Sequence, residues 1–396
     1  MIGLLLVALA ACYAGLITSF SLGFRRVAKH ASAVVSAEPG QLPFVSVIVP
    51  ARDESDVITN CISSILANDY PEDLFELIVV DDLSRDNTAE VVQHMISHTQ
   101  AATPVGFGYE EEDESRVRLL QMPENLQRAR AHKKRAIAKG IEAARGDIIL
   151  TTDADCTLPT SWIRTMAAAF DTPRVAFVSG PVHIRDRGDL WSGVQALEFL
   201  GLTSFGAGGI GVGRPNLCNG ANVAYRRDVF NELGGFGGID HLTSGDDELL
   251  MQKIAYETAH EVRFCALPEG AVITEPLDSL GAFAHQRRRW ASKGAHYPHR
   301  PLVVQAVLIY LFCLLLLGST LALPFTPGFL PYVAVAFLLK TAAEASVLIQ
   351  AAKQYRLGRL LRYLPVTQIL HLPYIVFLGA AGALGGYEWK GRSIER

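Results

Sequence analysis

The sequence has little charge for its length and no excess of positive charge. Charged residues make up 19% of the 396 residues, whereas apolar residues make up 49%. A soluble domain typically carries about a quarter charged residues, so we expect part of this chain to lie outside water. The formal net charge of -4 provides no basic field, which argues against a nucleic-acid-binding protein.

Closely spaced cysteines are also lacking. No two of the six cysteines stand at the short spacing that zinc-binding or redox motifs use. They are Cys12, Cys61, Cys156, Cys218, Cys265 and Cys313. We interpret them as scattered thiols in a reducing compartment.

An uncharged apolar run near the N-terminus has the length of a membrane span. It extends over residues 2–20, and Arg25, Arg26 and Lys29 follow it. Positive charges after a first span place the next domain in the cytosol, whereas a cleaved signal peptide carries them before its apolar core. We therefore expect an uncleaved anchor over residues 1–24.

Three further apolar runs, each of about twenty residues, follow a long polar region. They cover residues 302–323, 329–351 and 364–384. The positive-inside rule places the basic loop 353–362 in the cytosol, as an even number of preceding crossings requires. We expect about three transmembrane helices over residues 301–396. Because the tail is basic, the last helix can alternatively re-enter the membrane or lie on its surface instead of crossing it.

One of these runs contains two charges. Lys340 and Glu344 stand one helical turn apart, where they can pair and offset the cost of charge in hydrocarbon. We expect the pair to face the interior of the helical bundle. Two interpretations stay open, a structural ion pair and a site for a lipid headgroup.

Apolar strands alternate with helical patterns between the apolar ends of the chain. Strand-like runs at residues 44–50, 77–80, 117–121 and 147–150 each precede a polar loop and a helical pattern. This alternation predicts an α/β domain over residues 42–300, with a mostly parallel sheet covered by helices on both faces. Carboxylates follow the second and fourth runs, at the edge where such sheets bind ligands.

Two acidic motifs are candidates for chemistry. Asp153 and Asp155 follow a strand and are two residues apart, so an extended backbone points both carboxylates to the same side. Such paired oxygens suit Mg²⁺ or Mn²⁺, which can bridge the phosphates of a nucleotide. Asp246 and Asp247 open a predicted helix. Either motif alone is equally explained by capping of a helix, and we interpret the acidic run 109–114 as a solvated loop.

Together and in order, these segments resemble family 2 glycosyltransferases with the GT-A fold. The resemblance is to membrane-bound members of the cellulose-synthase-like and ceramide-glucosyltransferase-like group, and it covers about residues 44–290. The matching segments are VSVIVPARDE, IVVDDLSRDNT, HKKRAIAKGI, LTTDAD, NGANVAYRRDVFNELGGF, GDDELL and QRRRW. In isolation, the basic QRRRW segment is also explained as charge flanking a membrane span.

The resemblance implies a donor site and a metal. The donor-binding residues would contact a sugar linked to UDP or GDP, and they are Pro50, Ala51, Asp53, Glu54, Asp82, Lys133 and Asp153. Asp82 would accept a hydrogen bond from the base, and Lys133 would contact the phosphates. Asp155, together with Asp153, would hold Mg²⁺ or Mn²⁺.

The resemblance also implies a catalytic base and an acceptor side. Asp247 matches the base that deprotonates the acceptor hydroxyl, and Asp246 stands beside it where a Glu is more usual. Contacts to the acceptor and the diphosphate would come from Asn222, Gln286, Arg289 and Trp290. A single displacement would invert the anomeric centre without a covalent intermediate.

We therefore predict a multi-pass protein of a bacterial-type inner membrane with its catalytic domain in the cytosol. Its function would be metal-dependent, inverting transfer of a sugar to a lipid or lipid-linked acceptor. One alternative is a processive synthase that extrudes a polysaccharide, but Ala138, Gly245 and the small number of predicted spans depart from that pattern. A second alternative is an inactive membrane scaffold. A transporter is disfavoured because the predicted spans do not dominate the chain.

A GxGxxG pattern at Gly206, Gly208 and Gly211 is the spacing of a dinucleotide-binding loop. A helical pattern precedes it and a strand follows, which is the reverse of the order that such a loop requires. We predict instead a flexible loop near the acceptor entrance, beside a helix on the membrane surface.

Overall fold

The computed structural model describes residues 1–35, 42–101, 116–124, 131–292, 297–384, 387–389 and 392–394. The chain forms two compact units. Unit 1 consists of Met1–Lys29, His183–Leu217 and Pro276–Arg396, and unit 2 consists of His30–Val182 and Cys218–Glu275. This division differs from the expected catalytic domain over 42–300, because residues 183–217 and 276–300 belong to the unit with the apolar helices. The acidic run 109–114 lies outside the described residues.

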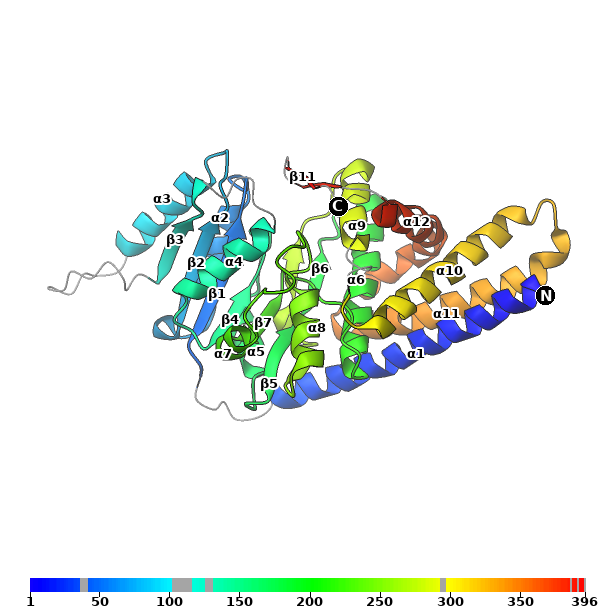
Figure 1. Ribbon diagram of the computed structural model, residues 1–396, viewed down its shortest axis with the longest axis horizontal. Coiled ribbons are helices and arrows are strands. Elements are labelled where there is room, and N and C mark those ends of the chain that lie inside the picture. Colours follow the sequence, from blue (N-terminus) through cyan, green and yellow to red (C-terminus); the bar gives the residue numbers. More distant parts are fainter. Residues whose placement is uncertain are drawn as a thin grey trace. The chain divides into compact units, whose positions relative to one another are not determined.

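Unit 2 contains a seven-stranded sheet with the order β3-β2-β1-β4-β7-β5-β8 (Figure 1). The strands β1 to β4 run parallel, and β7 is antiparallel to both of its neighbours. The sheet is made of β1 (Val45–Ala51), β2 (Phe75–Asp81), β3 (Val117–Gln121), β4 (Ile148–Thr151), β5 (Val175–Ser179), β7 (Val223–Arg226) and β8 (Glu261–Phe264). The predicted mostly parallel α/β sheet is confirmed.

Helices connect these strands, and α4 packs on β1 and β2. A Cβ added at Gly140 of α4 would lie 2.7 Å from Ile48 of β1. The glycine therefore lets α4 approach the sheet closely, which holds the first residues of α4 near the ends of the strands. The helices of this unit are α2 (Ile58–Leu66), α3 (Thr88–Ala101), α4 (His132–Ala143), α5 (Trp162–Ala168), α7 (Arg227–Glu232) and α8 (Glu248–Glu257), with short 3₁₀ turns at Glu72–Leu74 and Pro268–Gly270.

Unit 1 is helical. Its helices are α1 (Ile2–Val35, whose last residues reach unit 2), α6 (Leu190–Gly211), α9 (Leu280–Ala291), α10 (Arg300–Ala322), α11 (Leu330–Gln354) and α12 (Leu364–Leu384), with 3₁₀ turns at Pro327–Phe329 and Gly358–Tyr363. Short strands β10 (Tyr387–Trp389) and β11 (Arg392–Ile394) pair with each other, whereas β9 (Val272–Thr274) belongs to unit 2 and β6 (Val182–Ile184) spans the boundary in the chain between the two units. Among the described residues, four helical segments are long and apolar enough to cross a membrane: Ile2–Ala31, Arg300–Ala322, Pro327–Gln354 and Gly358–Gly382.

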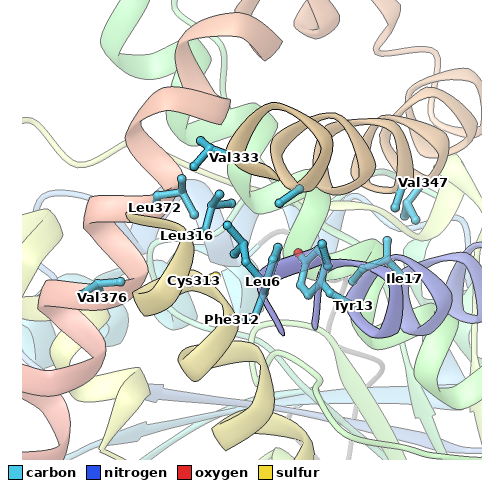
Figure 2. Packing of buried hydrophobic residues seen from close by; sticks show 13 residues of the cluster. Leu6, Tyr13, Ile17, Phe312, Cys313, Leu316, Val333, Val347, Leu372 and Val376 are labelled. Atoms are coloured by element: carbon cyan, nitrogen blue, oxygen red, sulfur yellow. The ribbon is translucent and has the colours of Figure 1, made fainter. Parts of the chain in front are cut away.

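Buried apolar side chains fill the space where α1, α10, α11 and α12 meet (Figure 2). The rings of Tyr13 and Phe312 pack with their centroids 4.8 Å apart. Around them lie Leu6, Ile17, Cys313, Leu316, Val333, Val347, Leu372 and Val376. Dispersion contacts of this kind hold helices together where lipid surrounds them.

A polar network lies inside the same bundle. The Lys340 ammonium is fully buried and lies 2.9 Å from Glu344 Oε2 and 2.9 Å from Gln368 Oε1. The Glu344 carboxylate also accepts hydrogen bonds from Tyr13 Oη and Gln368 Nε2. The expected interior pairing of Lys340 with Glu344 is thus present, and neighbouring helices satisfy its remaining hydrogen-bonding groups.

The glycines of the GxGxxG pattern lie inside helix α6, so the predicted flexible loop is wrong. A Cβ at Gly208 would lie 2.3 Å from the Phe20 carbonyl oxygen, and one at Gly211 would lie 2.2 Å from that of Gly23. The glycines allow the backbones of α1 and α6 to touch, and the close packing outweighs the weak helix propensity of glycine.

A buried carboxylate joins the strands at the opposite end of the sheet from Asp81. Glu76 of β2 accepts hydrogen bonds from Ser46 Oγ of β1 at 2.6 Å and from the Arg145 amide at 2.7 Å. Its second oxygen lies 2.7 Å from Arg118 Nη2 of β3 and 3.1 Å from Arg145 Nε. Burial raises the pKa of Glu76, but these hydrogen bonds and arginines outweigh burial and hold the pKa below its ordinary value.

We expect Glu76→Gln to lower the free energy of unfolding by about 3 kcal/mol at neutral pH, because it removes the charge of a fully buried carboxylate that pairs with the half-buried Arg118 and the more exposed Arg145. The folded-state pKa lies below the ordinary value of 4.5, so this stabilisation is present above that pH and is lost as the pH falls through the folded-state pKa. The difference between wild type and variant should therefore shrink in acid. Thermal unfolding followed by tryptophan fluorescence in detergent, at several pH values, measures it.

The matched control is Glu72→Gln. Glu72 pairs with Arg116 at 3.0 Å, but 84% of its side chain is exposed, so its loss should change stability by less than about 0.5 kcal/mol. An equally small effect of both substitutions would contradict the role given to Glu76.

Candidate active site

The site lies where the parallel strands of unit 2 end. In the sheet β2 lies on one side of β1 and β4 lies on the other, so the ends of β1 and β4 flank a switch point of the topology, where open sheets bind ligands. Pro50 and Ala51 end β1, and Ala51 pairs with Asp81 of β2. Asp82 directly follows β2, and Asp153 follows β4.

Lys133 and His132 together connect three of the acidic segments. The Lys133 ammonium lies 2.6 Å from Asp153 Oδ1 and 3.3 Å from Asp246 Oδ2. The preceding residue, His132, places Nδ1 at 3.3 Å from Asp82 Oδ1. The first two residues of α4 therefore join the carboxylates that follow β2 and β4 to the acid pair before α8.

Asp247 caps helix α8 and also contacts the segment before β7. Its Oδ1 accepts the Glu248 amide at 2.7 Å, and its Oδ2 accepts the Gly220 amide at 2.7 Å. A Cβ at Gly220 would lie 3.1 Å from Asp246 Oδ2 and 3.2 Å from Lys133 Nζ. Capping therefore explains only part of the geometry of Asp247. The bare backbone at Gly220 lets the acid pair, the lysine and Asp153 share one site.

The site carries a concentrated negative charge. Burial raises the pKa of the Cys61 and Cys156 thiols, and the nearby charges of Asp155 and Asp153 raise both further. Burial lowers the pKa of Lys133, but Asp153 and Asp246 outweigh burial and hold its pKa above the ordinary value, so the side chain is a cation at neutral pH. Both cysteines are therefore neutral thiols at neutral pH.

Asp153 and Asp155 lie in a turn after β4 and not on the extended backbone that the sequence predicted, because the Cys156 amide donates to the Asp153 carbonyl oxygen at 3.2 Å. Asp153 is half-buried and Asp155 is exposed, and Cys156 Sγ lies 3.5 Å from Asp155 Oδ1. In the part of the chain that the structure describes, no group of three or more His, Cys, Asp or Glu side chains can hold a metal. Mg²⁺ is commonly bound by one or two carboxylates together with substrate phosphates and water, which is what this pair offers.

The loops after β1 and β2 are hydrogen-bonded to each other. The Asp53 amide donates to Ser84 Oγ at 3.0 Å, and Asp53 Oδ1 accepts the Arg85 amide at 2.7 Å. The Glu54 amide donates to Thr88 Oγ1 at 2.9 Å. The side chain of Asp53 is therefore engaged in holding the loop, and the two loops form one wall beside the strand ends.

Three non-glycine residues around this wall have left-handed backbone conformations. The φ angles are 50° at Asp53, 59° at Leu83 and 55° at Ala131. Such conformations cost about 1–3 kcal/mol each and persist where the surroundings determine them. They follow β1, follow β2 and precede α4, so the strain gathers around the candidate site.

Asn222 does not have the surroundings expected for a residue that contacts an acceptor. Its side chain is fully buried, and its Oδ1 accepts Trp162 Nε1 at 2.9 Å. Its Nδ2 donates to the carbonyl oxygens of Pro181 and Gly270, each at 2.8 Å. This geometry corrects the expectation, because Asn222 joins three segments of unit 2 from within.

The residues expected at the diphosphate from the QRRRW segment lie in unit 1. Gln286, Arg289 and Trp290 are half-buried residues of α9. Arg287 between them is buried.

Two family models match the chain. Glycosyl transferase family 2 matches residues 46–234, and Glycosyl transferase family group 2 matches residues 148–348. The chain belongs to glycosyl transferase family group 2. The matched ranges contain all the residues of the acidic site, so this glycosyltransferase carries them within its family domain.

Curated relatives agree with this family. The chain is 28% identical to an N-acetylglucosaminyltransferase of Rhizobium meliloti over 65% of this chain and 58% of that protein. It is 23% identical to a poly-beta-1,6-N-acetyl-D-glucosamine synthase of Staphylococcus epidermidis over 66% of this chain and 57% of that one. The chain thus matches less than two thirds of the length of either relative.

The solved structure is mannosyltransferase PcManGT from Pyrobaculum calidifontis, in complex with GDP-Man and Mn²⁺. It shares 21% sequence identity with this glycosyltransferase at a TM-score of 0.51, covering 94% of this chain and 99% of that one. The likeness confirms the predicted GT-A fold.

We expect Gly220→Ala to lower the rate of sugar transfer about 10-fold, because misplacing catalytic groups by a fraction of an ångström is costly. The new methyl group would displace Asp246, Asp247 or Lys133, whereas the fold should keep its thermal midpoint. Gly318→Ala is the control, since a Cβ there meets nothing within 4 Å. Equal activity of the two variants in a transfer assay would contradict the close packing inferred at Gly220.

Proposed function

We propose that the protein is an inverting, metal-dependent glycosyltransferase that moves a sugar from a nucleotide-diphosphate donor to a lipid or lipid-linked acceptor. The observation that carries the proposal is the convergence of Lys133, Asp153, Asp246 and Asp247 at the ligand-binding edge of the sheet. A cation and several carboxylates in one place can hold a diphosphate, a metal and a proton acceptor together.

Asp247 is the proposed catalytic base. The amides of Gly220 and Glu248 hold its two oxygens, so the carboxylate has one orientation from which it can take the proton of an acceptor hydroxyl. Asp246 is held by Lys133, which suits a supporting role beside the base. Direct attack by the deprotonated hydroxyl would invert the anomeric centre.

The donor diphosphate is proposed to bind between Lys133 and the carboxylates after β4. Asp155 and Asp153 would hold Mg²⁺ or Mn²⁺, which supplies positive charge to the leaving diphosphate. Lys133 would exchange part of its contact with Asp153 for a phosphate oxygen. Pro50, Ala51 and Asp82, at the ends of β1 and β2, would form the nucleotide side, with Asp53 and Glu54 shaping the loop.

The donor is proposed to be linked to UDP or GDP. The relatives named above include N-acetylglucosaminyltransferases, and the solved structure of similar fold holds GDP-Man and Mn²⁺. The resemblance of the QRRRW segment assigns contacts with the diphosphate and acceptor to Gln286, Arg289 and Trp290.

The protein is proposed to span a bacterial-type inner membrane several times, with unit 2 in the cytosol. Arg25, in the basic stretch of α1, donates through Nε to Gln350 Oε1 of α11 at 2.6 Å. The basic end of α1 and the basic end of α11 therefore lie together within unit 1. This supports a topology in which both face the cytosol.

A processive synthase is the second candidate, and the relative that is named a polysaccharide synthase favours it. Buried side chains fill the interior of the α1, α10, α11 and α12 bundle (Figure 2). A polymer would therefore need a path other than the centre of this bundle, and we prefer a single transfer to a lipid-borne acceptor.

We expect purified protein in detergent to release UDP or GDP from one member of a panel of nucleotide sugars in the presence of Mn²⁺. EDTA should abolish release, and added Mn²⁺ or Mg²⁺ should restore it. Asp155→Asn should raise the Mn²⁺ concentration for half-maximal activity at least about 10-fold. Glu142→Gln, at an exposed position of α4, should leave it unchanged. Full activity in EDTA would rule out the metal.

We expect Asp247→Asn to lower the rate of transfer about 1,000-fold, as the loss of a general base does, with little change in the affinity for the donor nucleotide. Asp246→Asn should lower the rate of transfer by a smaller factor, because Asp153 still holds Lys133. Nucleotide titration and a transfer assay separate the two effects. A cell that keeps its normal function with the Asp247→Asn variant would instead support an inactive scaffold.

A further inference from the structure

One arginine of the QRRRW segment is buried within unit 1. Arg287 of α9 is only 3% exposed. Its guanidinium lies between two aromatic rings, 4.5 Å from the centroid of Phe283 and 4.2 Å from that of Trp290. Its Nη1 donates to the Gln286 side chain. The buried arginine therefore contacts two of the three residues assigned to the diphosphate and acceptor.

The charge of Arg287 is balanced by Glu198 of α6. Arg287 Nη2 and Glu198 Oε2 form an ion pair, in which both side chains are nearly inaccessible. The second oxygen of Glu198 accepts a hydrogen bond from Tyr374 Oη of α12 at 3.0 Å. One carboxylate thus joins α9 to α6 and to α12, a helix long and apolar enough to span a membrane.

Aromatic and backbone contacts surround this junction. Trp290 packs on Phe199 of α6 with centroids 5.8 Å apart, and Phe283 packs on Tyr374 at 5.8 Å. A Cβ added at Gly382 of α12 would lie 2.6 Å from Ala291 Cβ. The helices approach too closely for α9 to rotate freely about its own axis.

The direction of Arg287 sets the directions of its neighbours. Each helical residue is turned by about 100° from the one before it. Arg289, two residues on, therefore faces roughly the side opposite to Arg287, and it is half-buried rather than buried. Gln286 and Trp290 are four residues apart and share one side of the helix. A rotation of α9 would move all three together.

We propose that Glu198 and Tyr374 are positioning residues for sugar transfer. By holding Arg287 they fix the rotation of α9, and so the direction in which it presents Gln286, Arg289 and Trp290. This inference rests on the proposed function of those three residues. It also connects α12 physically to the QRRRW segment, so that the apolar bundle sets the geometry of a catalytic segment.

The test compares Glu198→Gln, Arg287→Gln, the double variant and Tyr374→Phe in the full-length protein. Glu198→Gln should lower kcat at least 10-fold and raise the KM for the acceptor, with the affinity for UMP or GMP, which lack the second phosphate, unchanged. Arg287→Gln should have a similar effect, and the double variant should be no worse than the poorer single variant. Tyr374→Phe keeps the ion pair and should lower kcat about 3-fold. This variant tests the proposal if Glu198→Gln fails to fold.

The control is Asp186→Asn. Asp186 is an equally buried carboxylate of unit 1, and it pairs with Arg359 at 3.5 Å and Arg362 at 3.6 Å. If it lowers kcat as much as Glu198→Gln does, the effect is general loosening of the unit and the inference is overturned. Wild-type kinetics in folded Glu198→Gln, or additive losses in the double variant, also overturn it.

The wild-type protein separates this inference from the proposed function. If the wild type releases no nucleotide from any donor, the proposed function fails. If the wild type is active and Glu198→Gln and Tyr374→Phe match it, only the positioning role fails.

Discussion

The arrangement of the site depends on one half-buried cation among carboxylates. Without Lys133, the carboxylates of Asp153 and Asp246 would face each other across a partly buried space with only water to separate them. The lysine is brought there by the packing of α4 on β1 and β2, which requires the bare backbone at Gly140. Hydrophobic packing far from the chemistry thus fixes where the positive charge stands, and the charge in turn allows the acids to gather.

Much of the sheet could be predicted from the sequence, because its strands are short apolar runs that end at polar loops. Parallel strands have their carboxyl ends on one edge, so the convergence of Asp82 and Asp153 toward that edge followed from the order of the runs alone. The role of Asp247 could be predicted only from the resemblance to a family, because a helix cap and a catalytic base cannot be told apart in a single sequence.

Other features depended on contacts between distant segments, which no local pattern reveals. The glycines at 206–211 look like a loop until α1, almost two hundred residues earlier, is seen to lie against them. Asn222 lies in a segment that resembles the family, yet its side chain is hydrogen-bonded to Trp162 and to two carbonyl oxygens. Glu198 lies in an apolar helix and belongs to no motif, and only its partners on α9 and α12 give it a role.

The polar network around Glu344 has a consequence for how the chain is made. Tyr13 of the first helix donates its hydrogen bond to Glu344, 331 positions later in the sequence. At the usual pace of translation the ribosome needs on the order of tens of seconds to cover that distance. Throughout this interval α1 exists without its partner. The bundle can therefore close only after the whole of unit 2 has emerged, so the enzymatic part has time to fold first.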